Sequence, residues 1–111
     1  MEFADRAARN EEVFRGVNER IEEGAARHDV ETPISFHCEC SRSGCVEKIS
    51  MSLGDYERVS GERYRFALAE GHDDPRIELV VERREGFVVA EKIGEAREQI
   101  DRDHPQERHR R

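Results

Sequence analysis

Three cysteines, Cys38, Cys40 and Cys45, lie close together in the stretch FHCECSRSGC, and the chain has no other cysteine. Three thiols cannot all pair with one another, whereas thiolates and imidazoles are the preferred ligands of tetrahedral zinc. In an extended strand residues i and i+2 face the same side, so Cys38 and Cys40 can reach one ion, and a turn at residues 41–44 would return Cys45 to it. The spacing predicts a zinc site that needs a fourth ligand.

The fourth ligand is expected among the histidines, which are His28, His37, His72, His104 and His109. His72 follows Gly71, a residue that lets the chain bend inward and present an imidazole. His37 alternates with the cysteines along the strand and therefore points away from their face, unless a bulge reverses it. We predict His72 as the ligand, with His37 as the alternative. A carboxylate of the adjacent Asp73 or Asp74 would accept the other ring N–H.

The residues around the cysteines leave other chemistries open. Arg42 and Lys48 flank the cluster, and positive charge lowers a thiol pKa, which suits metal binding and oxidation sensing alike. The cysteines could therefore form a redox sensor, pair as a disulfide on handling or stay inert. If three cysteines alone held zinc, water would take the open position, and Glu39 or Glu47 would be the general base of a metal-dependent hydrolase.

Catalysis is the less favoured interpretation. Three thiolates and one histidine fill the zinc tetrahedron and leave a formal charge of about −1, so the ion is a poor Lewis acid. The zinc deaminase signature H-x-E…P-C-x-x-C is incomplete, because no P-C-x-x-C follows His37-Cys38-Glu39. No G-x-G-x-x-G phosphate loop occurs in the sequence. We predict no catalytic residues and no cofactor other than zinc.

Length and composition predict one small domain with a modest core. The chain has 111 residues, of which 35% are hydrophobic and 41% charged, so much of it must lie in exposed helix faces, loops or tails. The longest apolar runs, residues 66–69 and 87–90, are far shorter than the roughly 20 residues of a membrane span. The acidic N-terminus does not resemble a signal peptide. We expect a cytoplasmic protein, in whose reducing compartment clustered cysteines are more often ligands or redox thiols than disulfides.

The net charge of −7 argues against a nucleic-acid partner. Residues 1–31 hold nine acidic residues and five arginines, and residues 94–111 hold five of each, so the negative charge lies in the body of the chain. Phosphate binding needs basic charge gathered on one face. Only the final ERHRR could touch an anion, and we expect that segment to be a disordered, solvated tail.

An amphipathic helix is predicted over residues 4–28. Asn10, followed by two glutamates, has the form of a helix start, and apolar residues recur at three- and four-residue steps at Phe14, Val17, Ile21 and Ala25. Gly16 and Gly24 weaken such a helix by about 1 kcal/mol each relative to Ala, so it must dock on something. We expect it to pack on the sheet of its own domain, with a protein partner or a second copy of the chain as the alternative.

Two hairpins are predicted after Pro33. The first joins residues 34–38 to residues 45–51 and carries the cysteines at its tip. The second joins residues 77–83 to residues 87–93, and Gly86 suits a turn position with positive φ. Between the hairpins, Ser52 and Asp55 form a capping signal for a short helix that ends near Gly61. A half-buried strand follows, in which Tyr64, Phe66 and Leu68 alternate with polar or small residues.

These elements predict an α+β fold, in which an N-terminal helix packs on a small antiparallel sheet of two hairpins with a short second helix. The helix covers residues 1–31 and the cysteine-containing core covers residues 32–94 of the same domain. Residues 95–111 form the charged tail, which we expect to be disordered.

The sequence as a whole resembles a family of small proteins from actinobacteria and related soil bacteria, to which no activity is assigned. The resemblance covers residues 11–94 and rests on VNER in the helix, F-x-C-E-C with a third cysteine, DYERV in the short helix, a GH loop and a VVAEK ending. The matching GH lies at Gly71-His72, where the family reads PGHE and this chain EGHD. An apolar residue often takes the position of His37. The resemblance therefore implies metal binding and His72 as a ligand.

The function predicted from the sequence is a non-catalytic, zinc-stabilised module with Cys38, Cys40, Cys45 and His72 as ligands. It would act through protein contacts, with a regulatory role, and the helix stripe and the arginine-rich tail are the expected contact surfaces. The metal would join segments about 30 residues apart, so its binding energy would add to the stability of a small core.

Overall fold

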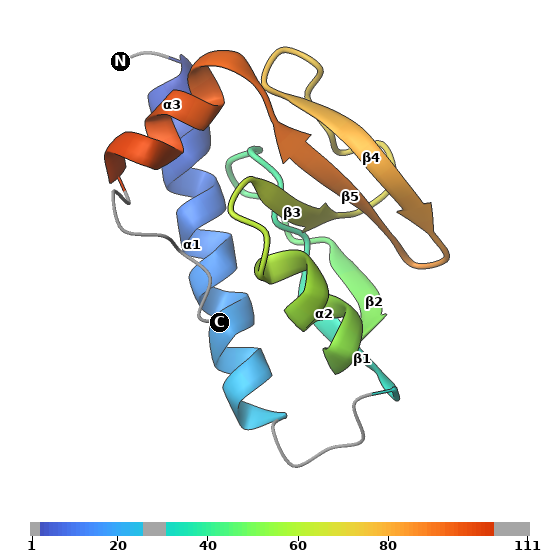
Figure 1. The fold of residues 1–111 in the computed structure, drawn as a ribbon. Coiled ribbons are helices and arrows are strands. Elements are labelled where there is room, and N and C mark those ends of the chain that lie inside the picture. Colours follow the sequence, from blue (N-terminus) through green and yellow to red (C-terminus); the bar gives the residue numbers. More distant parts are fainter. Residues whose placement is uncertain (1–2, 26–30, 104–111) are drawn as a thin grey trace.

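The computed structural model describes residues 3–25 and 31–103, with side chains from residue 13 onward. Along the chain lie α1 (Phe3–Gly24), β1 (Pro33–His37), β2 (Lys48–Ser52), α2 (Leu53–Ser60), β3 (Arg65–Leu68), β4 (Glu78–Arg84), β5 (Phe87–Lys92) and α3 (Gly94–Asp103) (Figure 1). The predicted α+β class is confirmed. None of the helices in these described ranges is long and apolar enough to cross a membrane.

The strands form two antiparallel sheets where the sequence analysis expected one. β1 pairs with β2, and β5 lies between β3 and β4 in a separate three-stranded sheet. The sheets meet at the turn of the second hairpin, where Ser50 N donates to Gly86 O at 3.3 Å. Gly86 has φ +97°, as the turn required, and a Cβ at this position would lie 2.6 Å from Ser50 O. This close approach therefore needs glycine for its space as well as its dihedral angle.

The core lies between α1, α2 and the two sheets. Phe36 of β1 stacks on Tyr56 of α2 with ring centroids 4.4 Å apart, and both side chains are fully buried. Ser52 caps α2 as predicted, since its Oγ accepts Asp55 N at 3.0 Å. The prediction of a half-buried β3 was wrong, because three consecutive residues, 66–68, are buried. Neighbouring elements cover β3 on both of its faces, which a period-two pattern cannot indicate.

Helix α1 differs from its prediction at its start and along its buried side. It begins at Phe3, so Asn10 lies inside the helix and is no cap; the alanines and arginines that precede Asn10 are good helix formers. Val17, expected in the buried stripe, is 41% exposed. The buried side instead holds Arg15 and Asn18 beside the partly buried Phe14. Its predicted extension to residue 28 falls outside the described residues.

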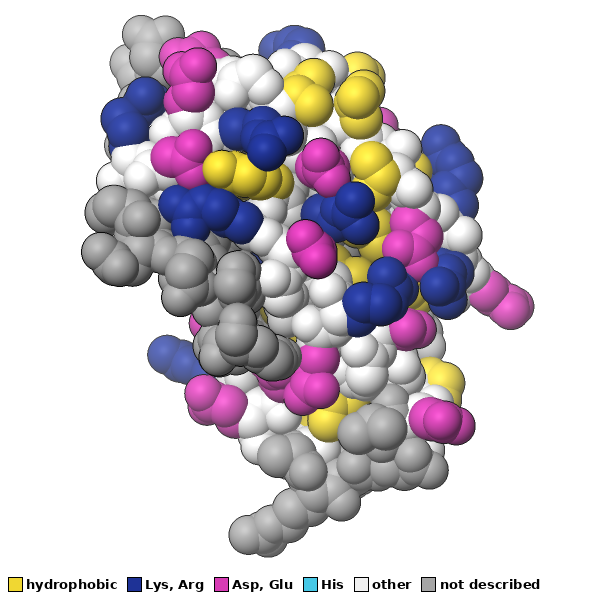
Figure 2. Space-filling view, viewed as in Figure 1, with side chains coloured by type: hydrophobic (Ala, Val, Ile, Leu, Met, Phe, Trp, Pro, Cys, Tyr) yellow, Lys and Arg dark blue, Asp and Glu magenta, His cyan; other side chains and the backbone are white. Residues whose placement is uncertain are grey.

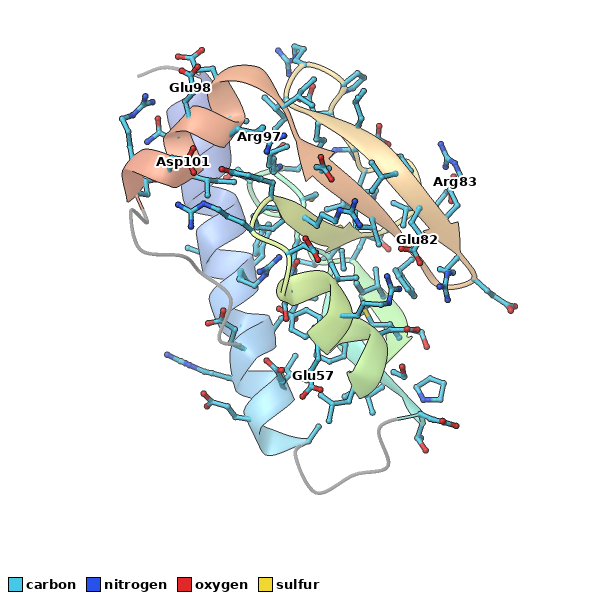
Figure 3. All side chains as sticks on the ribbon, viewed as in Figure 1. Glu57, Glu82, Arg83, Arg97, Glu98 and Asp101 are labelled. Atoms are coloured by element: carbon cyan, nitrogen blue, oxygen red, sulfur yellow. The ribbon has the colours of Figure 1, made fainter. Side chains whose placement is uncertain are left out.

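Helix α3 corrects the prediction of a disordered tail from residue 95. It covers residues 94–103, packs against α1, which it crosses at an angle (Figure 1), and buries Ala96 and Ile100. Arg97 and Asp101 project from α3 (Figure 3), and both contact Tyr64. The guanidinium carbon of Arg97 lies 3.9 Å from the centre of the Tyr64 ring, and the Tyr64 hydroxyl donates to Asp101 Oδ1 at 2.8 Å. Ala96 and Ile100 are four residues apart, a weak signal that the high charge of this segment concealed. Residues 104–111 fall outside the described part.

Basic and acidic side chains are interspersed over the face seen in Figure 2. Several exposed charged side chains of the protein pair, among them Arg58 with Glu82 at 2.9 Å and Arg83 with Glu70 at 2.7 Å. Exposed pairs of this kind contribute about 0–1 kcal/mol each, so the stability of the fold depends on the interior.

Candidate metal centre

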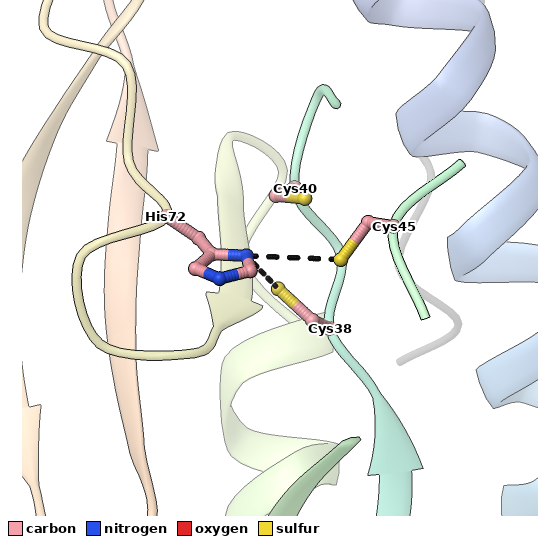
Figure 4. A group of neighbouring side chains, drawn as sticks. All are labelled: Cys38, Cys40, Cys45 and His72. Carbon is pink, nitrogen blue, oxygen red and sulfur yellow. Dashed lines mark hydrogen bonds between the residues drawn. The ribbon is translucent and has the colours of Figure 1, made fainter. Parts of the chain in front are cut away.

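The three cysteines and His72 come together between two loops. Cys38, Cys40 and Cys45 lie in the loop from β1 to β2, and His72 lies in the loop from β3 to β4 (Figure 4). One ligand atom from each of the four residues lies within 4.8 Å of all the others. The hairpin was predicted correctly, but the cysteines lie beyond its strands and not within them.

Two nitrogen–sulfur distances inside this group match the edge of a metal tetrahedron. His72 Nδ1 lies 3.5 Å from Cys38 Sγ and 3.7 Å from Cys45 Sγ. Zinc with bonds of about 2.3 Å to sulfur and about 2.0–2.1 Å to nitrogen, at tetrahedral angles, separates a sulfur from a nitrogen by about 3.6 Å. The side chains are therefore close enough together to bind one metal ion.

Backbone donors surround the sulfurs. Ala69 N donates to Cys38 Sγ at 3.1 Å. The backbone N–H groups of Arg42 and Glu47 donate to Cys40 and Cys45, respectively. A hydrogen bond to sulfur favours the thiolate over the thiol. Each sulfur therefore has a backbone donor that favours the thiolate, although the neighbouring thiols and burial outweigh this effect at Cys38 and Cys45.

The thiols also influence one another's ionisation. A hydrogen bond from Cys38 lowers the pKa of Cys40 to about 4, and the same bond is the main reason why the pKa of Cys38 is raised. Burial is the largest cause of the raised pKa of Cys45, and the nearby Cys40 raises it further. Without a cation, one thiolate therefore hinders ionisation of its neighbours. A divalent ion would remove this repulsion and allow all three to ionise.

His72 is directed to the sulfurs by the loop that carries it. Gly71 has φ +82°, and His72 N donates to Ala69 O at 3.0 Å, which closes a turn just after β3. Arg42 Nη2 donates to Gly71 O at 3.1 Å and joins this loop to the cysteine loop. The support expected from Asp74 is not observed, because its carboxylate binds Arg76 at 2.8 and 3.0 Å.

His37, the alternative ligand, has a different position. Its Nδ1 lies 2.6 Å from Cys38 O, its Nε2 lies 3.0 Å from Cys45 O, and its ring stacks on Phe14 at 4.2 Å. The ring thus joins the two ends of the cysteine loop and contacts α1. It lies outside the group of four, as strand alternation predicted.

Glu39, a candidate general base in the sequence, has a different role in the structure. The Glu39 side chain is fully buried, and its carboxylate accepts hydrogen bonds from Arg15 (2.9 and 3.1 Å), Asn18 (3.0 Å), Tyr56 (2.7 Å) and Ala67 N (3.0 Å). These donors occupy the lone pairs of both oxygens. Glu39 therefore has a structural role. Because it alternates with two cysteines that face the site, it had to point into the protein, and this was the available signal.

Arg15 determines the ionisation of Glu39. Burial is the largest influence and by itself would raise the pKa of this carboxyl group, but the charge and hydrogen bonds of Arg15 outweigh it, so the pKa of Glu39 is lowered from its ordinary value of 4.5. The Arg15 side chain is only 3% exposed. The two groups form a buried, charged pair between α1 and the cysteine loop.

A second buried pair holds the loop of His72. Lys92 of β5 pairs with Glu78 of β4, and both side chains are fully buried. The other oxygen of Glu78 accepts Asp74 N at 2.9 Å, two residues from His72. The ring of Phe66 lies beside both pairs, 4.4 Å from the Arg15 guanidinium carbon and 5.0 Å from Lys92 Nζ. A buried ion pair therefore supports each loop of the candidate site. Arg15 with Glu39 supports the cysteine loop, and Glu78 with Lys92 supports the loop of His72.

Comparison of the chain with models of protein families, with curated proteins and with solved structures finds no match in any of the three. The family resemblance suggested by the sequence therefore stays a prediction, and the arrangement of these four side chains is the main guide to function.

Proposed function

We propose that the chain is a non-catalytic, zinc-stabilised module in which Cys38, Cys40, Cys45 and His72 bind one zinc ion. The observation that supports this proposal is the convergence of four ligand atoms within 4.8 Å. They come from two loops, since His72 is 27 residues from Cys45 and 34 residues from Cys38. A metal that joins such distant segments adds its binding energy to the folding energy.

A structural role for zinc agrees with the surroundings of the site. Four protein ligands complete the tetrahedron and leave no position for a reacting water. Glu39, a candidate base for an open site, is already bound by Arg15 and Tyr56 inside the protein. A hydrolase would need a three-ligand site and another base.

A thiol redox sensor is the second candidate function, and the ionisation of the cysteines favours it. The lowered pKa of Cys40, whose largest cause is the hydrogen bond from Cys38, makes it the most readily ionised of the three, and the thiolate is the form that oxidants attack. In the zinc module this thiolate is bound to the metal; in the sensor it would be free to form a disulfide with a neighbour.

Contacts with another protein would use the exposed apolar residues of α1. Val13 is 62% exposed and Val17 is 41% exposed. They lie one turn apart, on the side of α1 opposite to the buried side chains of Arg15 and Asn18. Two valines make a small patch, so a weak or regulated contact with a protein or a second copy fits better than a permanent one.

Metal analysis of untagged protein purified under reducing conditions tests the proposal. We expect about one equivalent of zinc per chain, with cobalt exchange giving the visible absorption of a tetrahedral ion and thiolate-to-cobalt charge-transfer bands. Cys45→Ser and His72→Ala should lose the metal, whereas the control His37→Ala should keep it. Less than about half an equivalent in the wild type, with a disulfide forming reversibly in air, would favour the redox sensor.

A further inference from the structure

Glu39 connects the candidate metal site to helix α1. The residues on either side of it, Cys38 and Cys40, face the site, while Glu39 faces the interior and binds Arg15 of α1. Glu39 also pairs with β3, since its N donates to Ala67 O at 2.8 Å and its Oε1 accepts Ala67 N at 3.0 Å. A movement of Cys38 or Cys40 would therefore displace the anchor of α1.

The buried polar contacts of α1 converge on this short segment. Asn18 Nδ2 donates to His37 O at 2.6 Å and to Glu39 Oε2 at 3.0 Å, and Asn18 Oδ1 accepts His37 N at 2.7 Å. Phe14 stacks on the ring of His37, which itself contacts Cys38 O and Cys45 O. Asn18 thus pairs with the end of β1 as a neighbouring strand would, and Arg15 extends the contact to Glu39, two residues further along.

Among the side chains of α1 that the structure describes, from residue 13 onward, the apolar contribution to this contact is small. Phe14 and Ile21 are only partly buried, Val13 and Val17 are exposed, and Ala25 is a small side chain. Hydrophobic burial scales with area, at about 25 cal/mol per Å², so a narrow stripe holds a helix weakly. Besides its contact with α3 and one hydrogen bond from Arg15 to Arg65 O at 2.6 Å, α1 is attached through the polar contacts of Arg15 and Asn18 with residues 37–39. These contacts need residues 37–39 in place.

The three-stranded sheet has independent support. β5 pairs with β3 and β4 along their lengths, and the pair of Glu78 with Lys92 lies between β4 and β5. None of these contacts passes through the cysteine loop. Release of the metal should therefore loosen α1 while this sheet persists.

We propose, on the basis that the site binds zinc as described above, that zinc occupancy controls the docking of α1 through Glu39. With zinc bound, residues 37–39 are held and α1 is docked. Without zinc, the cysteine loop relaxes, Glu39 no longer meets Arg15 and Asn18, and α1 exposes its Phe14 side. By linkage, groups on α1 that never touch the metal must then strengthen zinc binding by the same factor.

Hydrogen exchange of the full chain tests this coupling. Peptides that cover residues 13–25 and residues 87–92 are compared in zinc-loaded protein and after removal of zinc by EDTA under reducing conditions. We expect the amides of α1 to exchange at least about tenfold faster without zinc and those of β5 to change by less than about threefold. Equal exchange of α1 in both states, or equal acceleration of α1 and β5, would overturn the coupling.

The reciprocal experiment measures zinc affinity by competition with a chromophoric chelator. Arg15→Gln should bind zinc about tenfold more weakly or worse, within the 5- to 150-fold range usual for coupled sites. Arg20→Gln, an exposed arginine of the same helix, is the matched control and should not change the affinity. If Arg15→Gln does not fold, Asn18→Ala replaces it, and unchanged affinity in that variant contradicts the coupling.

The outcomes separate the two proposals. A wild type without zinc contradicts the proposed function, and the coupling fails with it. A wild type that binds about one equivalent of zinc, but exchanges its α1 amides at the same rate with and without it, leaves the proposed function intact and removes only the coupling.

Discussion

Replacement of Arg15 by methionine would test the buried ion pair directly. Arg15 donates to Glu39 through Nε and Nη2 and to Arg65 O at 2.6 Å, and its guanidinium lies over Phe66. Methionine would keep much of the packing and remove the charge. Because the Glu39 carboxylate would stay buried without its cation, we expect a loss of about 3–5 kcal/mol in the free energy of unfolding. A domain of this size has about 5–15 kcal/mol in total.

The pH dependence of this loss separates charge from packing. In the wild type the pKa of Glu39 is lowered, since Arg15 outweighs burial. In Arg15→Met the hydrogen bonds from Ala67 N and Asn18 still oppose the effect of burial, which is the largest influence. We expect burial to outweigh them, so the folded-state pKa of Glu39 should lie above the unfolded value. A carboxyl group of that kind destabilises the fold most at high pH, and the penalty decreases as pH falls through its raised pKa. The difference between wild type and variant should therefore shrink from pH 8 to pH 6.

Urea unfolding followed by circular dichroism, in reducing buffer with excess zinc, gives both quantities. The control Arg20→Met removes an exposed arginine of the same helix and should change the free energy of unfolding by no more than about 0.5 kcal/mol. A cost below about 1 kcal/mol for Arg15→Met would refute the importance of the pair. A large cost that is the same at both pH values would assign it to packing.

Three further predictions concern the metal ligands, a turn and acid stability. His37→Ala should keep its zinc but melt at a lower temperature, because its ring joins the two ends of the cysteine loop, whereas His72→Ala should lose zinc; metal analysis after gel filtration and a thermal melt distinguish them. Gly86→Ala should cost more than about 1 kcal/mol in the free energy of unfolding, since it combines positive φ with a 2.6 Å approach to backbone. The helical Gly16→Ala, which meets nothing within 4 Å, should instead stabilise by up to about 1 kcal/mol, and comparable costs in both would contradict this account. The folded-state pKa of Glu39 is lowered, so its contribution to the free energy of unfolding should be fully present above pH 4.5 and be lost as pH falls below that value. Measuring the free energy of unfolding of wild type and Arg15→Met as a function of acid pH checks this prediction. Two curves that stay parallel would contradict it.

The structure also indicates why polar residues gather in so small a core. Arg15, Glu39, Glu78 and Lys92 are buried charges, and no buried side-chain nitrogen or oxygen of the described residues lacks a hydrogen-bond partner. Satisfied networks of this kind fix one arrangement, because any other packing would leave a charge unpaired. Such pairs favour a specific position of the two loops, which a small apolar core would hold less well.

Short-range features could be predicted from the sequence alone. The cap at Ser52, the glycine turn at Gly86 and the hairpin before the cysteines depend on the backbone geometry of a few neighbouring residues. The His37 ring points away from the group of sulfurs, and His72 lies among the cysteines, both as predicted. Strand alternation predicted the first, and the inward bend that Gly71 allows, together with the GH motif of the family resemblance, predicted the second.

Long-range features were decided only by the tertiary structure. Glu39 binds Arg15, which is 24 residues away in the sequence. No local sequence pattern predicts which buried acidic residue will pair with which basic residue. The split into two sheets and the docking of α3 likewise depend on how separate surfaces fit together. Periodicity reports whether a residue faces inward, but the partner it meets depends on packing and on the loop closure that brings distant segments together. The residues of the candidate metal centre could therefore be predicted from the sequence, whereas its connection to α1 through Glu39 could be recognised only in the tertiary structure.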